Sequence, residues 1–111
     1  MKYLCLVYME EKTLEAVPDR DCMAYGASLR KSGRYIAAEA LQRVATATTV
    51  RVRDGKVSLT DGPFAETKEQ LAGFYLIDAK DLDDAIQMAA KIPPARVGSI
   101  EVRPVRELSA K

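Results

Sequence analysis

The sequence predicts one α+β domain with a ferredoxin-like antiparallel sheet, two helices on one face of the sheet and an inserted β-hairpin. Three observations lead to this fold class. The chain has 111 residues, which suffices for one hydrophobic core. Its apolar residues alternate between strand-like and helix-like spacing, and an Asp-Gly turn separates two alternating segments. Because no break in composition marks a linker, residues 1–111 are treated as a single domain.

The first half of the chain predicts a strand, a helix and a second strand. Residues 3–9 are a continuous apolar run, typical of a central strand that is covered on both faces. Residues 18–32 change to helical spacing, with Asp19 near the positive end of the helix dipole and an expected end near Gly33. Residues 35–41 are expected to form a short strand of mostly small side chains.

A β-hairpin follows and is the strongest local signal in the chain. Residues 49–53 and 56–60 flank Asp54-Gly55, a dipeptide that tolerates the positive φ angles of a type I′ turn. This turn fixes the register of the hairpin. The register places the valines and Leu59 on one face and the arginines on the other, where we expect water.

The second half repeats the pattern of strand, helix and strand. Residues 71–78 are again nearly all apolar, and Gly73 within them marks a bulge or a close approach of another backbone. Asp81 is expected to cap a helix, and the proline pair at 93–94 to end it. Residues 99–105 alternate and form the last predicted strand. The predicted apolar stripe of the helix comprises Leu82, Ala85, Ile86, Ala89 and Ile92.

Without the hairpin, two strand–helix–strand units remain. Right-handed crossovers arrange such units in a ferredoxin-like sheet with both helices on one face. Residues 3–9 and 71–78 are apolar on both sides, so the face without helices also needs a cover. We therefore expect a homodimer with its sheets face to face, and a ligand in the enclosure that it forms.

Composition excludes several classes of function. Lys and Arg number 17 against 16 acidic residues, so the net charge of +1 argues against direct nucleic-acid binding. The chain has no histidine, which excludes histidine-based acid–base pairs, Ser-His-Asp triads and His-ligated metals. Neither a metal nor another cofactor is indicated. No apolar run reaches the roughly 18–20 residues of a membrane span, and we expect a cytoplasmic protein.

Residues 46–70, above all the turn Asp61-Gly62-Pro63-Phe64, resemble the DGPF branch of the YCII-related family. The resemblance extends over nearly the whole chain, including Gly73-Phe74-Tyr75 and residues 98–104. It implies a dimeric α+β barrel of two ferredoxin-like domains. The family's biochemistry is largely uncharacterised, and the His and Asp pair proposed as catalytic in its YCII branch cannot operate in a chain without histidine.

Glu39 is the first candidate for a catalytic base. It lies in a run of small residues that could leave a cavity around its carboxylate, where loss of water would make it a stronger base. The structural alternative has equal weight. In it, Glu39 is an edge-strand carboxylate that pairs with Arg43 or Arg34 in solvent.

Asp61 is the second catalytic candidate. In this hypothesis Asp61 or Glu66 removes a proton beside a carbonyl group, and Lys68 stabilises the enolate. In the structural alternative, Asp61 only bonds backbone amides of its own turn. Tyr8 and Tyr75 are candidates to supply hydroxyl groups to the cavity expected around Glu39. In the structural alternative they are ordinary core tyrosines.

The leading hypothesis is a YCII-like domain that binds a small polar or aromatic metabolite in a cleft of the dimeric barrel. Carboxylate-based proton transfer, of the isomerase or lyase type, is its candidate activity. The alternative is a non-enzymatic interaction or regulatory module, because the family also occurs fused to sigma-factor-like transcription proteins. The sequence leaves open whether the protein is an enzyme.

Overall fold

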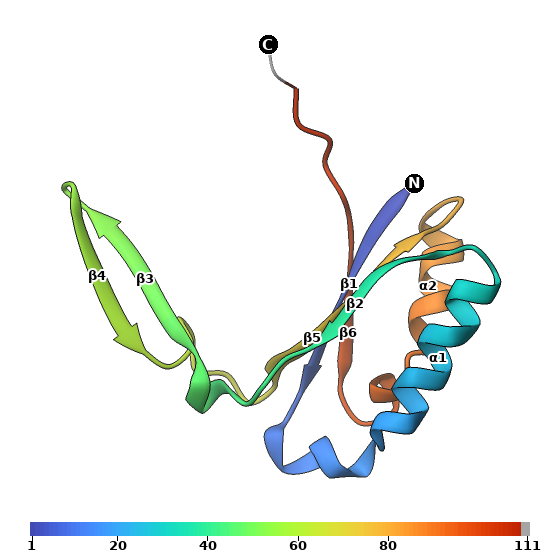
Figure 1. The fold of residues 1–111 in the computed structure, drawn as a ribbon, viewed down its shortest axis with the longest axis horizontal. Helices are drawn as coiled ribbons and strands as arrows, with labels where there is room; N and C mark the ends of the chain where they lie inside the picture. The colour runs from blue at the N-terminus through green and yellow to red at the C-terminus, as the bar shows by residue number, and fades with distance from the viewer. Residues whose placement is uncertain (110–111) are drawn as a thin grey trace.

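The chain folds into a four-stranded antiparallel sheet, two α-helices on one face of it, and a separate two-stranded hairpin (Figure 1). The computed structural model describes residues 1–109. In chain order the elements are β1 (Lys2–Met9), the 3-10 helix η1 (Glu11–Ala16), α1 (Asp19–Lys31), β2 (Tyr35–Ala40), η2 (Val44–Thr46), β3 (Thr48–Arg53), β4 (Lys56–Asp61), β5 (Gln70–Asp78), α2 (Leu82–Ala90), η3 (Pro93–Arg96) and β6 (Ser99–Pro104).

The strand order in the main sheet is β2-β5-β1-β6, with each neighbouring pair antiparallel. Two strand–helix–strand units therefore interleave, which is the ferredoxin-like arrangement, and the predicted fold class is confirmed. Both α1 and α2 lie on the same side of the sheet (Figure 1). Neither these helices nor any other in residues 1–109 is long and apolar enough to cross a membrane.

The hydrophobic core lies between the sheet and the two helices. Alternate residues of β1, from Tyr3 to Met9, are buried against the helices, and Ile77 of β5 and Ile92 behind α2 are each only 1% exposed. The intervening β1 residues Leu4 and Leu6 point to the opposite face and are only half-buried. The two central strands, β1 and β5, are thus apolar on both faces, and within residues 1–109 the helices cover only one of these faces.

Helix α2 begins as predicted, but the face that it buries differs in part from the predicted one. The side chain of Asp81 caps α2 as expected, because its Oδ1 accepts a hydrogen bond of 2.9 Å from the Asp84 backbone N–H. The predicted apolar stripe is partly wrong. Leu82 and Ile86 are 50% and 48% exposed, while Met88 is buried beside Ala85 and Ala89. The helix is rotated so that its small residues face the sheet, which lets it approach closely.

The hairpin forms as predicted, and its apolar residues remain exposed within the described residues 1–109. Asp54 and Gly55 have φ angles of 51° and 74°, as a type I′ turn requires, and Val52 lies opposite Val57. β3 and β4 make a sheet of their own, here called the β3–β4 arm (residues 48–61), which stands away from the helices (Figure 1).

Two glycines allow close contacts between neighbouring backbones. A Cβ atom on Gly73 would lie 2.7 Å from the Glu39 carbonyl oxygen, at the point where the register between β1 and β5 shifts. This confirms the expected bulge and close approach at Gly73. A Cβ atom on Gly98 would overlap the carbonyl oxygen of Tyr8. These glycines hold β2 and the start of β6 tightly against the central strands.

Candidate ligand-binding cleft

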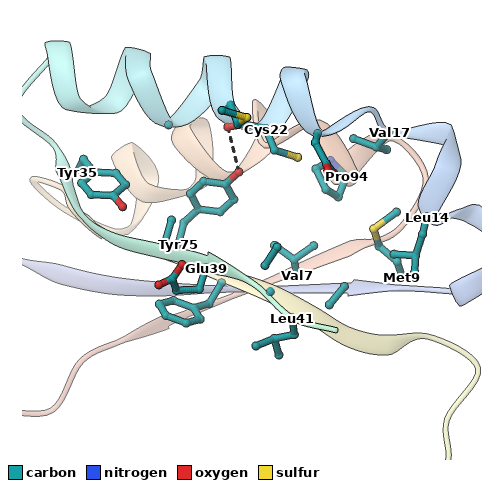
Figure 2. Close-up of a pocket in the computed structure, with 18 of the residues that line it drawn as sticks. Val7, Met9, Leu14, Val17, Cys22, Tyr35, Glu39, Leu41, Tyr75 and Pro94 are labelled. Atoms are coloured by element: carbon teal, nitrogen blue, oxygen red, sulfur yellow. Dashed lines mark hydrogen bonds between the residues drawn. The ribbon is translucent and has the colours of Figure 1, made fainter. Parts of the chain in front are cut away.

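A cleft of about 670 Å3 lies between α1 and the β2–β5 side of the sheet (Figure 2). Its walls are built from small residues: Cys22, Gly26 and Ala27 on α1 face Ala38 and Ala40 on β2. A Cβ atom added to Gly26 would meet nothing within 4 Å. Small residues at these facing positions leave the space between the helix and the strand open.

Larger apolar side chains form the floor and one end of the cleft. Val7 and Tyr75 rise from the central strands, and Met9, Leu14 and Val17 gather where η1 meets α1 (Figure 2). Tyr35 stands at the other end of the cleft (Figure 2). A ligand would therefore contact mostly carbon, with polar atoms at a few fixed points.

The Tyr75 hydroxyl is the polar group on the floor of the cleft. It donates a hydrogen bond of 3.5 Å to the Cys22 carbonyl oxygen, and its ring meets Tyr25 edge-on with the ring centroids 5.4 Å apart. Burial raises the pKa of Tyr75 above the ordinary value of 10, so the hydroxyl stays protonated near neutral pH. Burial likewise raises the pKa of the Cys22 thiol, which disfavours the thiolate form.

Arg30 is the one cation among the described residues that line the cleft. Its guanidinium carbon lies 4.2 Å from the ring centroid of Tyr35. Stacking uses the flat face of the guanidinium group and leaves the N–H groups at its edge for another partner. Within residues 1–109 Arg30 takes part in none of the ion pairs. An anionic group of a ligand would find its counter-charge here.

The sequence matches the model of the YCII-related domain over residues 1–109. This chain belongs to the YCII-related family. It is also 38% identical, over 114 aligned residues, to an uncharacterised protein of Rhizobium meliloti (strain 1021). That alignment covers 95% of this chain and 92% of the relative. The relative is itself uncharacterised, so the similarity assigns no function to this YCII-related domain.

The sheet of the YCII-related domain separates two groups of predicted site residues. Tyr75 points toward α1, into the cleft, whereas Glu39 lies at the rim on the other side of β2 (Figure 2). Glu39 is paired with Phe74 and shares its face, and Tyr8 occupies that face too, by alternation along β1. Glu39 is exposed, and among residues 1–109 it forms no ion pair with Arg34 or Arg43. Arg34 binds Asp84 instead.

The three remaining predicted residues lie away from the cleft. Asp61 is exposed at the end of β4, and Glu66 is exposed in the loop that follows. The Lys68 Nζ lies 3.3 Å from Oε1 of Glu10. Hydrogen bonds from Lys12 and Lys68 lower the pKa of Glu10, so this ion pair is established near neutral pH.

Sequence reasoning missed the residues that build the cleft. Arg30 and Tyr35 were not among the candidates, and neither was the wall formed by Gly26 and Ala27. One signal was present: small residues on one face of the α1 helix, followed by an alanine-rich strand. This signal predicts a cleft only if the helix and the strand face each other, and that contact is not encoded locally. Within residues 1–109, no three Cys, Asp or Glu side chains come together in a group that could hold a metal ion.

Proposed function

We propose that this YCII-related domain binds a small molecule with an aromatic or apolar body and one anionic group, in the cleft between α1 and the sheet. The observation that supports this proposal is the cleft itself. Its volume of about 670 Å3 is within the range of roughly 300–1,000 Å3 of small-molecule sites. Its walls are apolar, and a few polar groups converge on it, as is usual in such sites.

Arg30 and Tyr75 give the ligand its orientation. A carboxylate near the free edge of Arg30 would form charge-assisted hydrogen bonds. The apolar body would then extend along the small residues of α1 toward the Tyr75 hydroxyl. Specificity for an anion thus depends on Arg30, whereas the size limit depends on Ala27 and its neighbours.

Ligand-dependent melting tests this proposal. We expect 2-naphthoate to raise the melting temperature, and its uncharged analogue 2-naphthamide to do so much less. At a ligand concentration of 100 times Kd, binding to the folded state adds about 2.7 kcal/mol to the free energy of unfolding. Ala27→Phe, which fills the cleft, should abolish the shift. Ala24→Phe is the matched control, because Ala24 is exposed on the same helix and does not line the cleft.

An aromatic carboxylate panel that moves the melting temperature of neither the wild type nor the control would contradict the proposal. Equal shifts in the Ala27→Phe and Ala24→Phe variants would also contradict it, because the ligand would then bind elsewhere. Arg30→Gln separates recognition of the anionic group from binding of the apolar body. It should remove the preference for naphthoate over naphthamide and leave the fold intact.

We also propose that the domain acts as a homodimer that pairs through the face without helices. That face carries Leu4, Leu6 and Tyr8 of β1 beside Phe74 and Leu76 of β5, all half-buried within one chain. Five apolar side chains on adjacent strands form a patch of the kind that marks protein interfaces. Leu6→Asp should weaken pairing without unfolding the chain, because Leu6 is outside the buried core. Sedimentation equilibrium measures this effect.

Carboxylate-based proton transfer is the second candidate activity, and the position of Glu39 favours it. Glu39 lies beside Phe74 on the face that pairing would cover, so a dimer would shield its carboxylate from bulk water. We expect the wild type to catalyse exchange of the α-protons of 2-oxo acids in deuterium oxide, and Glu39→Gln to lose this exchange. Asp61→Asn tests the second carboxylate. Wild-type exchange no faster than buffer would exclude the activity for this substrate class.

A further inference from the structure

The β3–β4 arm presents an apolar face that no other part of the described chain, residues 1–109, covers. In the observed register Val50 faces Leu59 and Val52 faces Val57, and these four side chains are 57–68% exposed. A two-stranded hairpin without a packing partner is marginally stable at best in water. Contiguous exposed apolar side chains on a soluble protein often mark a contact with another molecule.

The surface of the whole chain supports the same conclusion. The chain exposes 8127 Å2, whereas a compact monomer of 12.2 kDa would expose about 6,100 Å2. Its radius of gyration is 15.9 Å, against about 13 Å for a compact domain of this length. The excess surface is roughly 2,000 Å2 per chain, in part from residues 105–109. Two chains together would therefore hide an area in the range of obligate homodimers, roughly 2,000–5,000 Å2.

The arm and the face without helices lie on the same side of the molecule. Figure 1 shows the helices on one side of the sheet and the arm extending on the other. A single partner on that side can therefore contact both the arm and the face without helices, which carries Leu6 and Phe74. A second copy of the chain satisfies both needs at once, because a two-fold axis gives each chain the same two contacts. The net charge of +1 opposes such pairing very little.

We propose that the β3–β4 arm is a clasp for a second copy of this chain, and that its apolar face packs on that copy when the two sheets pair. The clasp rests on the proposed homodimer and adds a contact surface outside the sheet. Its specific claim concerns one face of the arm. The face with Val57 becomes buried on pairing, and the face with the neighbouring Ser58 does not.

A single introduced tryptophan reports on this burial, because the chain has none of its own. Val57→Trp places the indole on the apolar face, and Ser58→Trp places it on the other face of the same strand. Both positions are exposed in the single chain, so neither substitution disturbs the core. Emission excited at the red edge of tryptophan absorption, and the mass by light scattering, are measured on the same concentration series.

We expect the Val57→Trp emission to shift to shorter wavelength over the concentrations at which the mass doubles, while Ser58→Trp emission stays that of an indole in water. A doubled mass with no shift at position 57 would overturn the clasp and leave the homodimer standing. A single-chain mass at all concentrations would overturn both. A shift at position 57 that is already complete in the monomer would also overturn the clasp, since the arm would then fold on its own chain.

A second pair of variants controls for the possibility that the introduced indole itself promotes pairing. Val57→Asp should raise the Kd of the dimer at least about tenfold, because the charge would be buried without a partner. Ser58→Asp is the control and should leave Kd within about twofold. Circular dichroism verifies that the fold is retained. Equal Kd values for the two aspartate variants would contradict the assignment of the apolar face to the interface.

Discussion

β1 and the β3–β4 arm follow the same two-residue alternation but end in different environments. In β1, Tyr3 and Val7 are 3% and 4% exposed, because α1 and α2 lie over them. In the arm, Val52 and Val57 are 57% and 68% exposed. Alternation therefore determines which side chains share a face, while burial depends on what tertiary neighbour covers that face. The apolar face of the arm is uncovered as far as the structure describes the chain, and we propose that a partner covers it.

The sharpest contrast between the two regions is the cost of removing an apolar side chain. Ile77→Ala should lower the free energy of unfolding by about 2–5 kcal/mol at every protein concentration, because it leaves a cavity in the core. Val57→Ala should change the stability of the monomer by less than about 0.5 kcal/mol. Its effect should appear only at concentrations that favour pairing. Urea unfolding over a range of protein concentrations separates the two, and a monomer destabilised equally by both would contradict the contrast.

Within the four-stranded sheet and its helices, two glycines offer a second comparison between a crowded and an open position. Gly98→Ala should destabilise the fold by roughly 1–3 kcal/mol, since the added Cβ would overlap the Tyr8 carbonyl oxygen. Gly26→Ala is the matched control. A Cβ there would project into the cleft and meet nothing within 4 Å, so alanine should stabilise α1 by about 0.5–1 kcal/mol. Thermal unfolding of both variants would reveal the opposite signs, and two destabilised variants would show that Gly26 is required for another reason.

The smallest expected effect is a dependence of stability on pH, which arises at the partly buried ion pair between Arg34 and Asp84. Arg34 Nη1 donates to both carboxylate oxygens of Asp84 at 2.8 Å, and this hydrogen bonding holds the pKa of Asp84 below its ordinary value of 3.8. A lowered pKa in the folded state stabilises the fold above the ordinary value. That stabilisation is lost as the pH falls through the folded-state pKa.

Asp84→Asn should therefore be less stable than the wild type near neutral pH, and the two melting temperatures should converge as the pH falls below about 4. The effect is small because this ion pair is only partly buried, so water and salt still screen it. Asp83→Asn is the control on the same turn of α2. A wild type and an Asp84→Asn variant that keep a constant separation down to the lowest pH would contradict the role of the ion pair.

Local chemistry was enough to predict most of the fold. Asp54-Gly55 specified the turn and the register of the arm, and Asp81 specified the start of α2, because each depends only on backbone preferences of nearby residues. Gly73 was identified as a close-approach position for the same reason. The rotation of α2 was not predictable in this way. Whether Ile86 or Met88 faces the sheet depends on the fit between two surfaces distant in sequence.

The site was less predictable than the fold. Glu39 was chosen because small residues surround it in sequence, yet alternation directs those neighbours, and not Glu39, toward α1. Arg30 gained importance only through its stacking on Tyr35, a contact between a helix and a strand. Candidate residues on the arm, such as Asp61, are separated from the cleft because the hairpin extends away from the body.

The mass of the protein in solution tests the need for a partner most directly. Light scattering on the wild type should give twice the chain mass of 12.2 kDa at micromolar concentration. Dilution should restore the single-chain mass, and Leu6→Asp should shift the midpoint to higher concentration. A monodisperse species of 12.2 kDa at concentrations up to about 100 μM would contradict the account. The apolar faces of the central sheet and of the β3–β4 arm would then both be stable in water.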